Sequence, residues 1–488
     1  MTDRHDAPER RIAGRRSALL YLFGSLLQGL GLILIQPFAV RLLSEFEWGL
    51  VATSIVLIQV VVVLLSAGLP LAITQLWFDQ DDGRNRARAM YGFLAIACLA
   101  IGGALAVGAG VVGRNDAVGT PWTIVLAMLI IGLLGTVLGA QAVLRAQDRP
   151  VAFVVLSVCS SVVANLAGLG AILVVGETAL VYIVAYGAAV VLSVVVALFL
   201  VRPRLPWKVS GMTRASLTIA APLLPHTGAL MLLTQGAVLL LAQLSGASEA
   251  GRYGAVLIFA LGPLTILNAL NNSWSTRIMS ADSRELHGSI RAVAGEAAVS
   301  ALLVGLLASS AANIGAHVLT TDPGSLVHVA QILPTVSLGY ALFLVAGNVL
   351  YVVHRTRLMA FATPAVLLVT TSLAILPAAA PTLTLLAAVH GAGFAVLGAT
   401  YLLAVRRYTP SDAWPSSAFL YCAAGHVLFV VLIRLAPVTL LWGAVELIAV
   451  LSVIGTAALF WLRRRPRTST AGQAAASNDP RTADQVGD

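Results

Sequence analysis

About fourteen apolar runs, each close to or above 20 residues long, divide this sequence and limit what it can fold into. An α-helix of about 20 residues crosses the roughly 30 Å hydrocarbon core of a bilayer, and helices satisfy all of their backbone groups internally. With 59% hydrophobic and 10% charged residues and a mean hydropathy of +0.91, the chain is predicted to be an all-α polytopic membrane protein with about 14 transmembrane helices. The runs lie near residues 17–40, 49–78, 89–112, 122–144, 151–175, 179–201, 217–243, 254–276, 293–319, 329–353, 358–378, 382–405, 418–436 and 438–462.

The positive charge of the chain indicates orientation in a membrane. The net charge is +9 and the chain has 30 Lys and Arg residues, but these sit in short segments between apolar runs and form no stripe with interleaved aromatics, which argues against nucleic-acid binding. With both termini cytoplasmic, most basic residues fall on the inner side. Those left on the outer side are Arg41, Arg114, Arg252 and Arg434.

The order of apolar and polar segments predicts two six-helix lobes followed by two further helices. A basic connector near residues 204–216, with Lys208 and Arg214, interrupts the apolar runs at mid-chain. The expected division is a cytoplasmic tail (1–16), an N-terminal lobe (17–203), the connector (204–216), a C-terminal lobe (217–405), the last two transmembrane helices (406–462) and a disordered cytoplasmic tail (463–488).

Two short polar segments between apolar runs, which we call elbows, have similar sequences and support a repeat that relates the two lobes. Residues 41–50 and 243–254 each contain Leu-Ser, then small or acidic residues, then an aromatic residue followed by glycine. The aromatic-glycine pairs are Trp48-Gly49 and Tyr253-Gly254. A parallel repeat of this kind is a recurrent way to build a transporter.

Neither an enzyme nor a metal or cofactor protein is indicated by the sequence. The three cysteines lie inside apolar runs without metal-ligand spacing, as small buried hydrophobes do. No outer loop exceeds about a dozen residues, which leaves little room for an extracytoplasmic active site. We therefore expect no catalytic residue, no metal ligand and no cofactor.

Several segments together resemble the polysaccharide and O-antigen flippases of the multidrug/oligosaccharidyl-lipid/polysaccharide exporter superfamily. The segments are Gln36-Pro37-Phe38-Ala39-Val40-Arg41-Leu42-Leu43-Ser44, Leu65-Ser66-Ala67-Gly68-Leu69-Pro70, Ala221-Pro222-Leu223-Leu224-Pro225, and Tyr340 to Asn348 leading into Arg355-Thr356-Arg357. The resemblance implies two pseudo-symmetric lobes around a central cavity and alternating access. It also implies that a polyprenyl-(pyro)phosphate-linked oligosaccharide moves from the inner to the outer leaflet.

Polar residues inside the predicted helices are the candidates for substrate contact, because such residues are costly in a bilayer. In the first run Gln28 and Gln36 share a face, and in the seventh His226 and Gln235 are candidates. In the eighth run the amides of Asn268, Asn271 and Asn272 form a compact face. The alternative for each is an interhelical hydrogen bond that holds the bundle together.

Two arginines at the elbows could hold the phosphate of the substrate as it reaches the outer leaflet. A guanidinium matches phosphate oxygens in geometry and charge. Arg41 lies four residues before Glu45, and Arg252 lies three residues after Glu249. Ion pairs with these acids are the structural alternative.

Other functions remain open at this stage. They are a cation-coupled multidrug exporter of the same fold, a peptidoglycan-precursor flippase, and a non-transporting membrane scaffold of a polysaccharide assembly complex. The expected partners are the polyprenyl-linked glycan and membrane lipids, with a polysaccharide polymerase and glycosyltransferases as further candidates. A single lysine, Lys208, beside many arginines and alanines suggests a GC-rich bacterial genome, so a multi-pass protein of the bacterial cytoplasmic membrane is predicted.

Overall fold

A computed structural model describes residues 20–464 of the chain, apart from residues 22, 25–26, 28–30, 32–33, 67, 80–81, 116–120, 209–223, 283 and 321. The described residues form helices joined by short turns. The helices of the first half are α2 (Glu45–Ser66), α3 (Leu69–Trp77), α4 (Gly83–Asn115), α5 (Trp122–Ala146), α6 (Pro150–Ser157), a π-helical turn (Val158–Val163), α7 (Ala164–Val174), α8 (Ala179–Val201) and a 3-10 turn (Pro206–Lys208). Residues 34–42, which precede α2, are also helical.

The second half continues in the same manner. Its helices are α10 (Leu224–Leu244), α11 (Ala247–Val256), α12 (Ile258–Met279), α13 (Leu286–Leu319), α14 (Pro323–Ile332), a 3-10 turn (Leu333–Thr335), α15 (Val336–Val352), α16 (Arg357–Ala379), α17 (Leu383–Val405), a 3-10 turn (Ser411–Ala413), α18 (Ser416–Ile433) and α19 (Leu440–Arg464).

The prediction of an all-α membrane protein is confirmed. Within the described residues, eleven helices are long and apolar enough to cross a membrane, and α11 with α12 makes a twelfth if this pair, bent by 45°, is one span. The spans 150–174 and 323–352 each combine shorter helices. The first predicted run lies partly outside the described residues, and Leu440–Thr456 of α19 is a shorter apolar helix.

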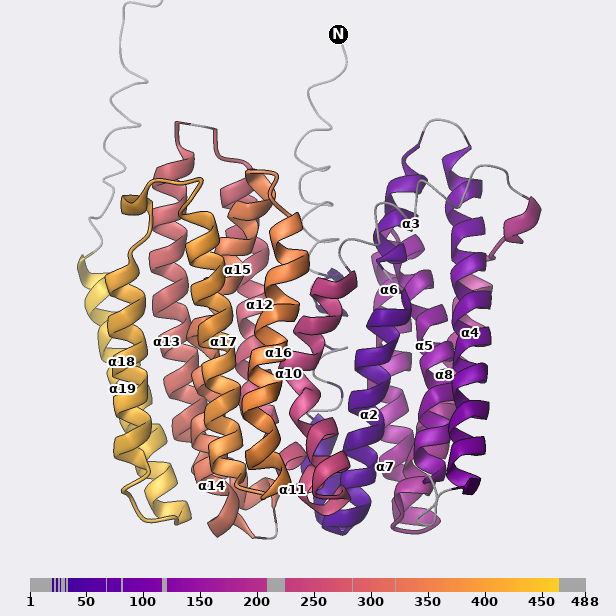
Figure 1. The fold of residues 1–488 in the computed structure, drawn as a ribbon, viewed down its shortest axis with the longest axis horizontal. Coiled ribbons are helices and arrows are strands. Elements are labelled where there is room, and N and C mark those ends of the chain that lie inside the picture. Colours follow the sequence, from indigo (N-terminus) through magenta and orange to yellow (C-terminus); the bar gives the residue numbers. More distant parts are fainter. Residues whose placement is uncertain are drawn as a thin grey trace, which may run out of the picture.

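The helices gather into two groups that lie side by side (Figure 1). Helices α2 to α8 form one group, and α10 to α17 form the other, with α18 and α19 packed against α13. We call these groups the N-lobe and the C-lobe. The main contacts between them join α2 to α10 and α2 to α11.

The two elbows pack directly against each other at one end of the molecule, which we call the elbow end (Figure 1). A Cβ added to Gly49 of α2 would lie 1.7 Å from the carbonyl oxygen of Ala247, and one added to Gly251 of α11 would lie 2.3 Å from the carbonyl oxygen of Glu45. Only glycine permits such an approach of two helix backbones. Trp48 and Tyr253 are buried beside this crossing.

The opposite end, which we call the far end, carries the basic loops. Arg84 and Arg88 begin α4 there and lie over the ring of Trp77 at 5.9 and 6.0 Å. Arg145 ends α5 and lies over Phe153 at the same end. This distribution agrees with the charge asymmetry read from the sequence. That the far end faces the cytoplasm stays a prediction based on that asymmetry.

Substituting Gly49 with alanine should destabilise the contact between the lobes. The added methyl meets the backbone of Ala247, which cannot move aside as a flexible side chain would, and overpacking of this kind costs about 1–3 kcal/mol. The unfolding temperature of the purified protein in detergent should therefore fall. Gly262→Ala in α12 is the matched control, because no atom lies within 4 Å of the added methyl and helix propensity improves. Equal unfolding temperatures for both variants would contradict the crossing.

Candidate functional site: the cavity between the lobes

A cavity of about 430 Å³ lies between the lobes and is lined by side chains of both. Its volume falls in the range of small-molecule sites. Apolar side chains form much of the wall. The polar residues in the lining are Gln36, Gln59, Ser160, Ser161, Asn165, Tyr186, Gln235 and Thr265. Among the described residues that line it, none is Asp, Glu, Lys, Arg or His, so the cavity is polar but uncharged.

Two amide side chains connect the lobes across this cavity. Gln235 of α10 donates a hydrogen bond from Nε2 to Oε1 of Gln59 in α2, at 2.7 Å. Gln36 donates from Nε2 to the carbonyl oxygens of Ala255 and Gly254, at 2.7 and 3.2 Å. These two carbonyls lie just before the bend between α11 and α12, where the regular helical pattern of hydrogen bonds is interrupted. Gln36 and Gln235 therefore both line the cavity and hold it together.

The N-lobe wall of the cavity contains a π-helical turn. Residues Val158–Val163 adopt this conformation within an otherwise α-helical span, and such turns often mark functional sites. Asn165 donates to the carbonyl oxygen of Ser161 at 2.8 Å and accepts a hydrogen bond from the hydroxyl of Tyr182 at 2.9 Å. The turn is thereby fixed, with Ser160 and Ser161 in the cavity lining.

The predicted asparagine face of α12 continues from the cavity toward the far end. Leu261 and Thr265 line the cavity, and Asn268 and Asn272 follow on the same helical stripe, because residues spaced by three or four share a face. Asn268 accepts a hydrogen bond from the Tyr340 hydroxyl at 2.9 Å. The Asn272 side chain is exposed.

Asn271 has a different environment from its two neighbours. Its Oδ1 accepts a hydrogen bond from Nδ2 of Asn348 in α15, at 2.8 Å, and the residue is half-buried. It therefore joins α12 to α15 within the C-lobe. The three asparagines share one helix, but the structure brings none of them into the cavity lining.

His226 lies inside the C-lobe and not among the residues that line the cavity. Its Nδ1 is 2.8 Å from the hydroxyl of Thr363 and 3.2 Å from that of Tyr401, and it packs beside Phe343. The residue is buried, with 6% of its surface exposed. This geometry matches the interhelical hydrogen bond that the sequence left open as the alternative for this residue.

Arg41 does not pair with Glu45, so the ion pair expected from their spacing is wrong. The Arg41 guanidinium donates from Nε and Nη2 to the carbonyl oxygens of Val318 and His317, both at 2.8 Å. These carbonyls belong to the last turn of α13, where the helix leaves acceptors without intrahelical partners. Arg41 therefore caps a helix of the C-lobe from the N-terminal half of the chain. The other acid of the elbow, Glu47, accepts a hydrogen bond from the backbone N–H of Ala179 at 2.6 Å.

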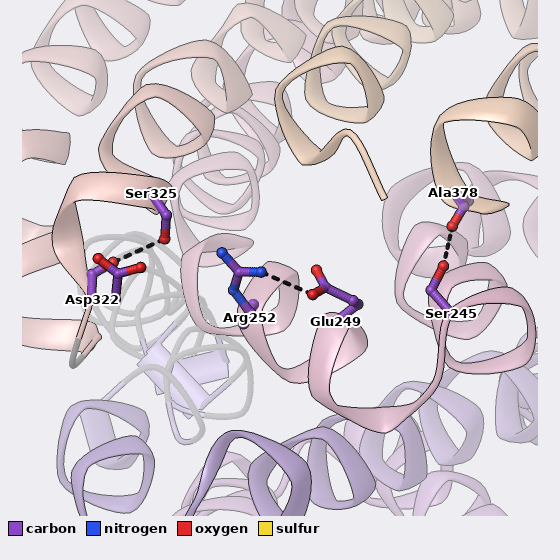
Figure 2. Close-up of polar contacts among 6 residues, drawn as sticks. All are labelled: Ser245, Glu249, Arg252, Asp322, Ser325 and Ala378. Carbon is purple, nitrogen blue, oxygen red and sulfur yellow. Dashed lines mark hydrogen bonds and ion pairs between the residues drawn. The ribbon is translucent and has the colours of Figure 1, made fainter. Parts of the chain in front are cut away.

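Arg252 forms the ion pair that its position suggests. Its Nη1 lies 2.8 Å from Oε1 of Glu249, one turn earlier in α11 (Figure 2). In the same view Ser245, just before α11, donates to the carbonyl oxygen of Ala378 at the end of α16. The second elbow is thus tied by side chains to its own lobe.

Gln28 lies outside the described residues. The cavity also contains polar residues that the sequence patterns did not single out, chiefly Gln59, Asn165 and Tyr186. Gln59 is the single amide side chain in a helix that is otherwise apolar over most of its length, which is a signal that a search for intramembrane polar residues could have found. Asn165 is likewise the single amide of an apolar run, residues 151–175, whereas Tyr186 of α8 has no comparable signal.

Comparison with known proteins identifies a family and a fold. The sequence profile of the family described as "Polysaccharide biosynthesis protein" matches residues 14–274, more than half of the chain. No curated protein sequence matches the chain.

Several solved structures share the fold at low sequence identity. One is the lipid II flippase MurJ in an inward closed conformation, with a TM-score of 0.62 and 13% identity, covering 92% of this chain and 99% of the flippase. An inward-facing multidrug resistance transporter of the MATE family and MOP superfamily has a TM-score of 0.60 and 13% identity. The match covers 84% of this chain and 98% of that transporter. A third structure is a MOP-superfamily transporter from Pyrococcus furiosus, whose description states a reverse polarity of its binding pocket. It has a TM-score of 0.59 and 14% identity, and the match covers 86% of this chain and 96% of that transporter.

Replacing Asn165 with alanine should destabilise the π-helical turn of the cavity wall. The variant loses two hydrogen bonds, one within the span to Ser161 and one from Tyr182 of α8, and an interhelical bond such as the second contributes about 0.6–2 kcal/mol. A lower unfolding temperature in detergent is expected. Ser372→Ala serves as the control, because Ser372 is exposed and bonds only within its own helix turn. If Asn165→Ala unfolds no earlier than this control, the turn does not depend on Asn165.

Proposed function

The chain belongs to the polysaccharide biosynthesis protein family, and on this basis we propose that it is a flippase for a polyprenyl-(pyro)phosphate-linked oligosaccharide. It is a multi-pass membrane protein with a transporter fold. The proposed location is the bacterial cytoplasmic membrane, and the proposed direction of transport is from the inner to the outer leaflet. Its product would serve cell-surface polysaccharide synthesis, with a polymerase and glycosyltransferases as partners.

The observation that carries this proposal is the uncharged polar cavity between the lobes. Sugar hydroxyl groups donate and accept hydrogen bonds, and amides and hydroxyls offer both functions at one atom or at neighbouring atoms. Gln36, Gln59 and Gln235 present such groups from three different helices. A glycan that replaces the hydrogen bond between Gln59 and Gln235 would recover its energy, so binding would separate the two lobes at little cost.

The arrangement of the two ends suggests how access would alternate. In this conformation the elbow end is closed by the crossing of Gly49 and Gly251 and by the Arg41 cap on α13. The stripe that runs from Thr265 through Asn268 to Asn272 leads from the cavity toward the far end. We infer that the glycan enters along this stripe and leaves after the elbow crossing opens. Arg41 would then be a closing contact whose Nε and Nη2 become free for a bidentate contact with phosphate when the lobes separate.

The competing functions account for the cavity less well. A cation-coupled multidrug exporter needs a charged group for a cationic drug or for the coupling ion, and the described lining has no carboxylate. A peptidoglycan precursor carries the carboxylates of its peptide in addition to the linking pyrophosphate, and no arginine or lysine is found among those lining residues to pair with them. A scaffold without transport gives no reason for a cavity of about 430 Å³ that is lined by polar groups of both lobes.

Reconstitution tests the proposed activity directly. The purified chain in proteoliposomes should increase the rate at which a labelled polyprenyl-pyrophosphate-linked oligosaccharide becomes accessible to a membrane-impermeant reagent outside. Gln59→Leu should reduce this rate at least roughly tenfold, because the cavity loses the acceptor that joins the lobes and one polar contact for the glycan.

A second buried glutamine provides the control. Gln331 of α14 is buried, lies near His328 and does not line the cavity, so Gln331→Leu should retain most of the activity. Drug efflux driven by protons or sodium, with no movement of the labelled lipid, would refute the proposal in favour of the multidrug exporter. If the liposomes show neither activity, the scaffold would be preferred.

A further inference from the structure

The cavity has a chemical property that narrows the substrate class, namely the complete absence of charge among its described lining residues. Residues 17–33, which precede Gln36 in the first apolar run, contain no Asp, Glu, Lys, Arg or His. The polar side chains that each lobe contributes to the described lining are amides and hydroxyls only. The cavity therefore has hydrogen-bonding capacity without a field that favours either sign of charge.

Three arginines, two at the elbows and one in α12, already have partners. Arg41 is held by two carbonyl oxygens at the end of α13. Arg252 is paired with Glu249, and Arg277 is paired with Glu296. None of the three lines the cavity, and an arginine drawn from its partner to an anionic sugar would leave carbonyls or a carboxylate without that contact.

We infer that the chain is selective for glycans whose sugars are electrically neutral, and that it discriminates against uronic acids and free amino sugars in the part of the substrate that enters the cavity. This inference rests on the proposed flippase function. Taking an uncompensated carboxylate or ammonium from water into such a cavity is unfavourable, whereas a sugar hydroxyl exchanges water for Gln59, Gln235 or Asn165. The linking phosphate is common to neutral and charged substrates and does not decide between them.

Three synthetic substrates of equal size isolate the charge of the sugar. Each carries the same polyprenyl pyrophosphate and a labelled disaccharide that ends in a hexose, a hexuronic acid or a hexosamine with a free amine. In proteoliposomes of the full chain at neutral pH, the hexose substrate should be flipped at least roughly tenfold faster than either charged one. The measured quantity is the ratio of rates, which does not depend on how much protein is folded.

Variants at two cavity positions test whether the lining sets this ratio. Gln59→Lys places a cation in the cavity and should raise the acidic-to-neutral ratio roughly tenfold, whereas Gln59→Met, of similar length and without charge, should leave the ratio unchanged. Gln235→Glu introduces the opposite charge and should instead raise the rate for the hexosamine substrate relative to the hexose substrate. This second variant keeps the test available if the lysine variant does not fold.

The outcomes separate the two proposals. If the wild-type chain flips neutral and charged substrates at equal rates, the selectivity is refuted and the flippase function stands. If the ratio favours the neutral substrate but neither Gln59→Lys nor Gln235→Glu changes it, the cavity is not the selective element and the inference fails in its present form. If none of the three substrates moves, the flippase function itself is refuted, and the selectivity with it.

Discussion

The close crossing of α2 and α11 is the contact on which the arrangement of the lobes depends. Inside a bilayer, apolar side chains gain little by leaving lipid for protein, so helices associate through tight packing and hydrogen bonds. Gly49 and Gly251 bring two backbones into direct contact at the elbow end. Arg41 then spans from the helix before the first elbow to the end of α13. Because the lobes are in contact at the elbow end, a polar cavity can exist only where they separate farther along the molecule.

Along the lobe interface, uncharged polar residues and charged residues lie in different places. Beside the lobe interface, charged groups lie toward the elbow and far ends, where Arg252 pairs with an acid and Arg88 stacks on an aromatic ring. The interior retains uncharged groups such as Gln235 and Asn165, each already hydrogen-bonded. This division is expected on energetic grounds, since a neutral amide in a low-dielectric interior costs far less than an ion. It also means that a ligand competes with internal hydrogen bonds of moderate strength and not with ion pairs.

The sequence predicted the class of fold well and the site less well. Apolar run length and the position of basic loops depend on the bilayer, which acts on every span alike, so they could be read without knowledge of tertiary contacts. Gln36 and Gln235 were found because an amide in an apolar helix stands out. His226 looked equivalent in the sequence, yet it turns toward Thr363 within its own lobe. The direction in which a helix faces is set by its neighbours, and a single sequence does not report them.

The case of Arg41 shows why local spacing misled. An arginine four residues before a glutamate favours a pair on a continuous helix, but the chain leaves helical geometry at Leu43 and Ser44, between the two residues. The guanidinium is thereby free to reach carbonyls more than 270 positions away in the sequence. The last turn of α13 leaves those carbonyls without intrahelical partners, and a cation with a planar fork meets two of them at once. An arginine at the elbow is thus explained by its contact with the C-lobe. In the proposed cycle, Nε and Nη2 of Arg41 would reach a phosphate after that cap is lost, so substrate release would follow opening of the elbow end.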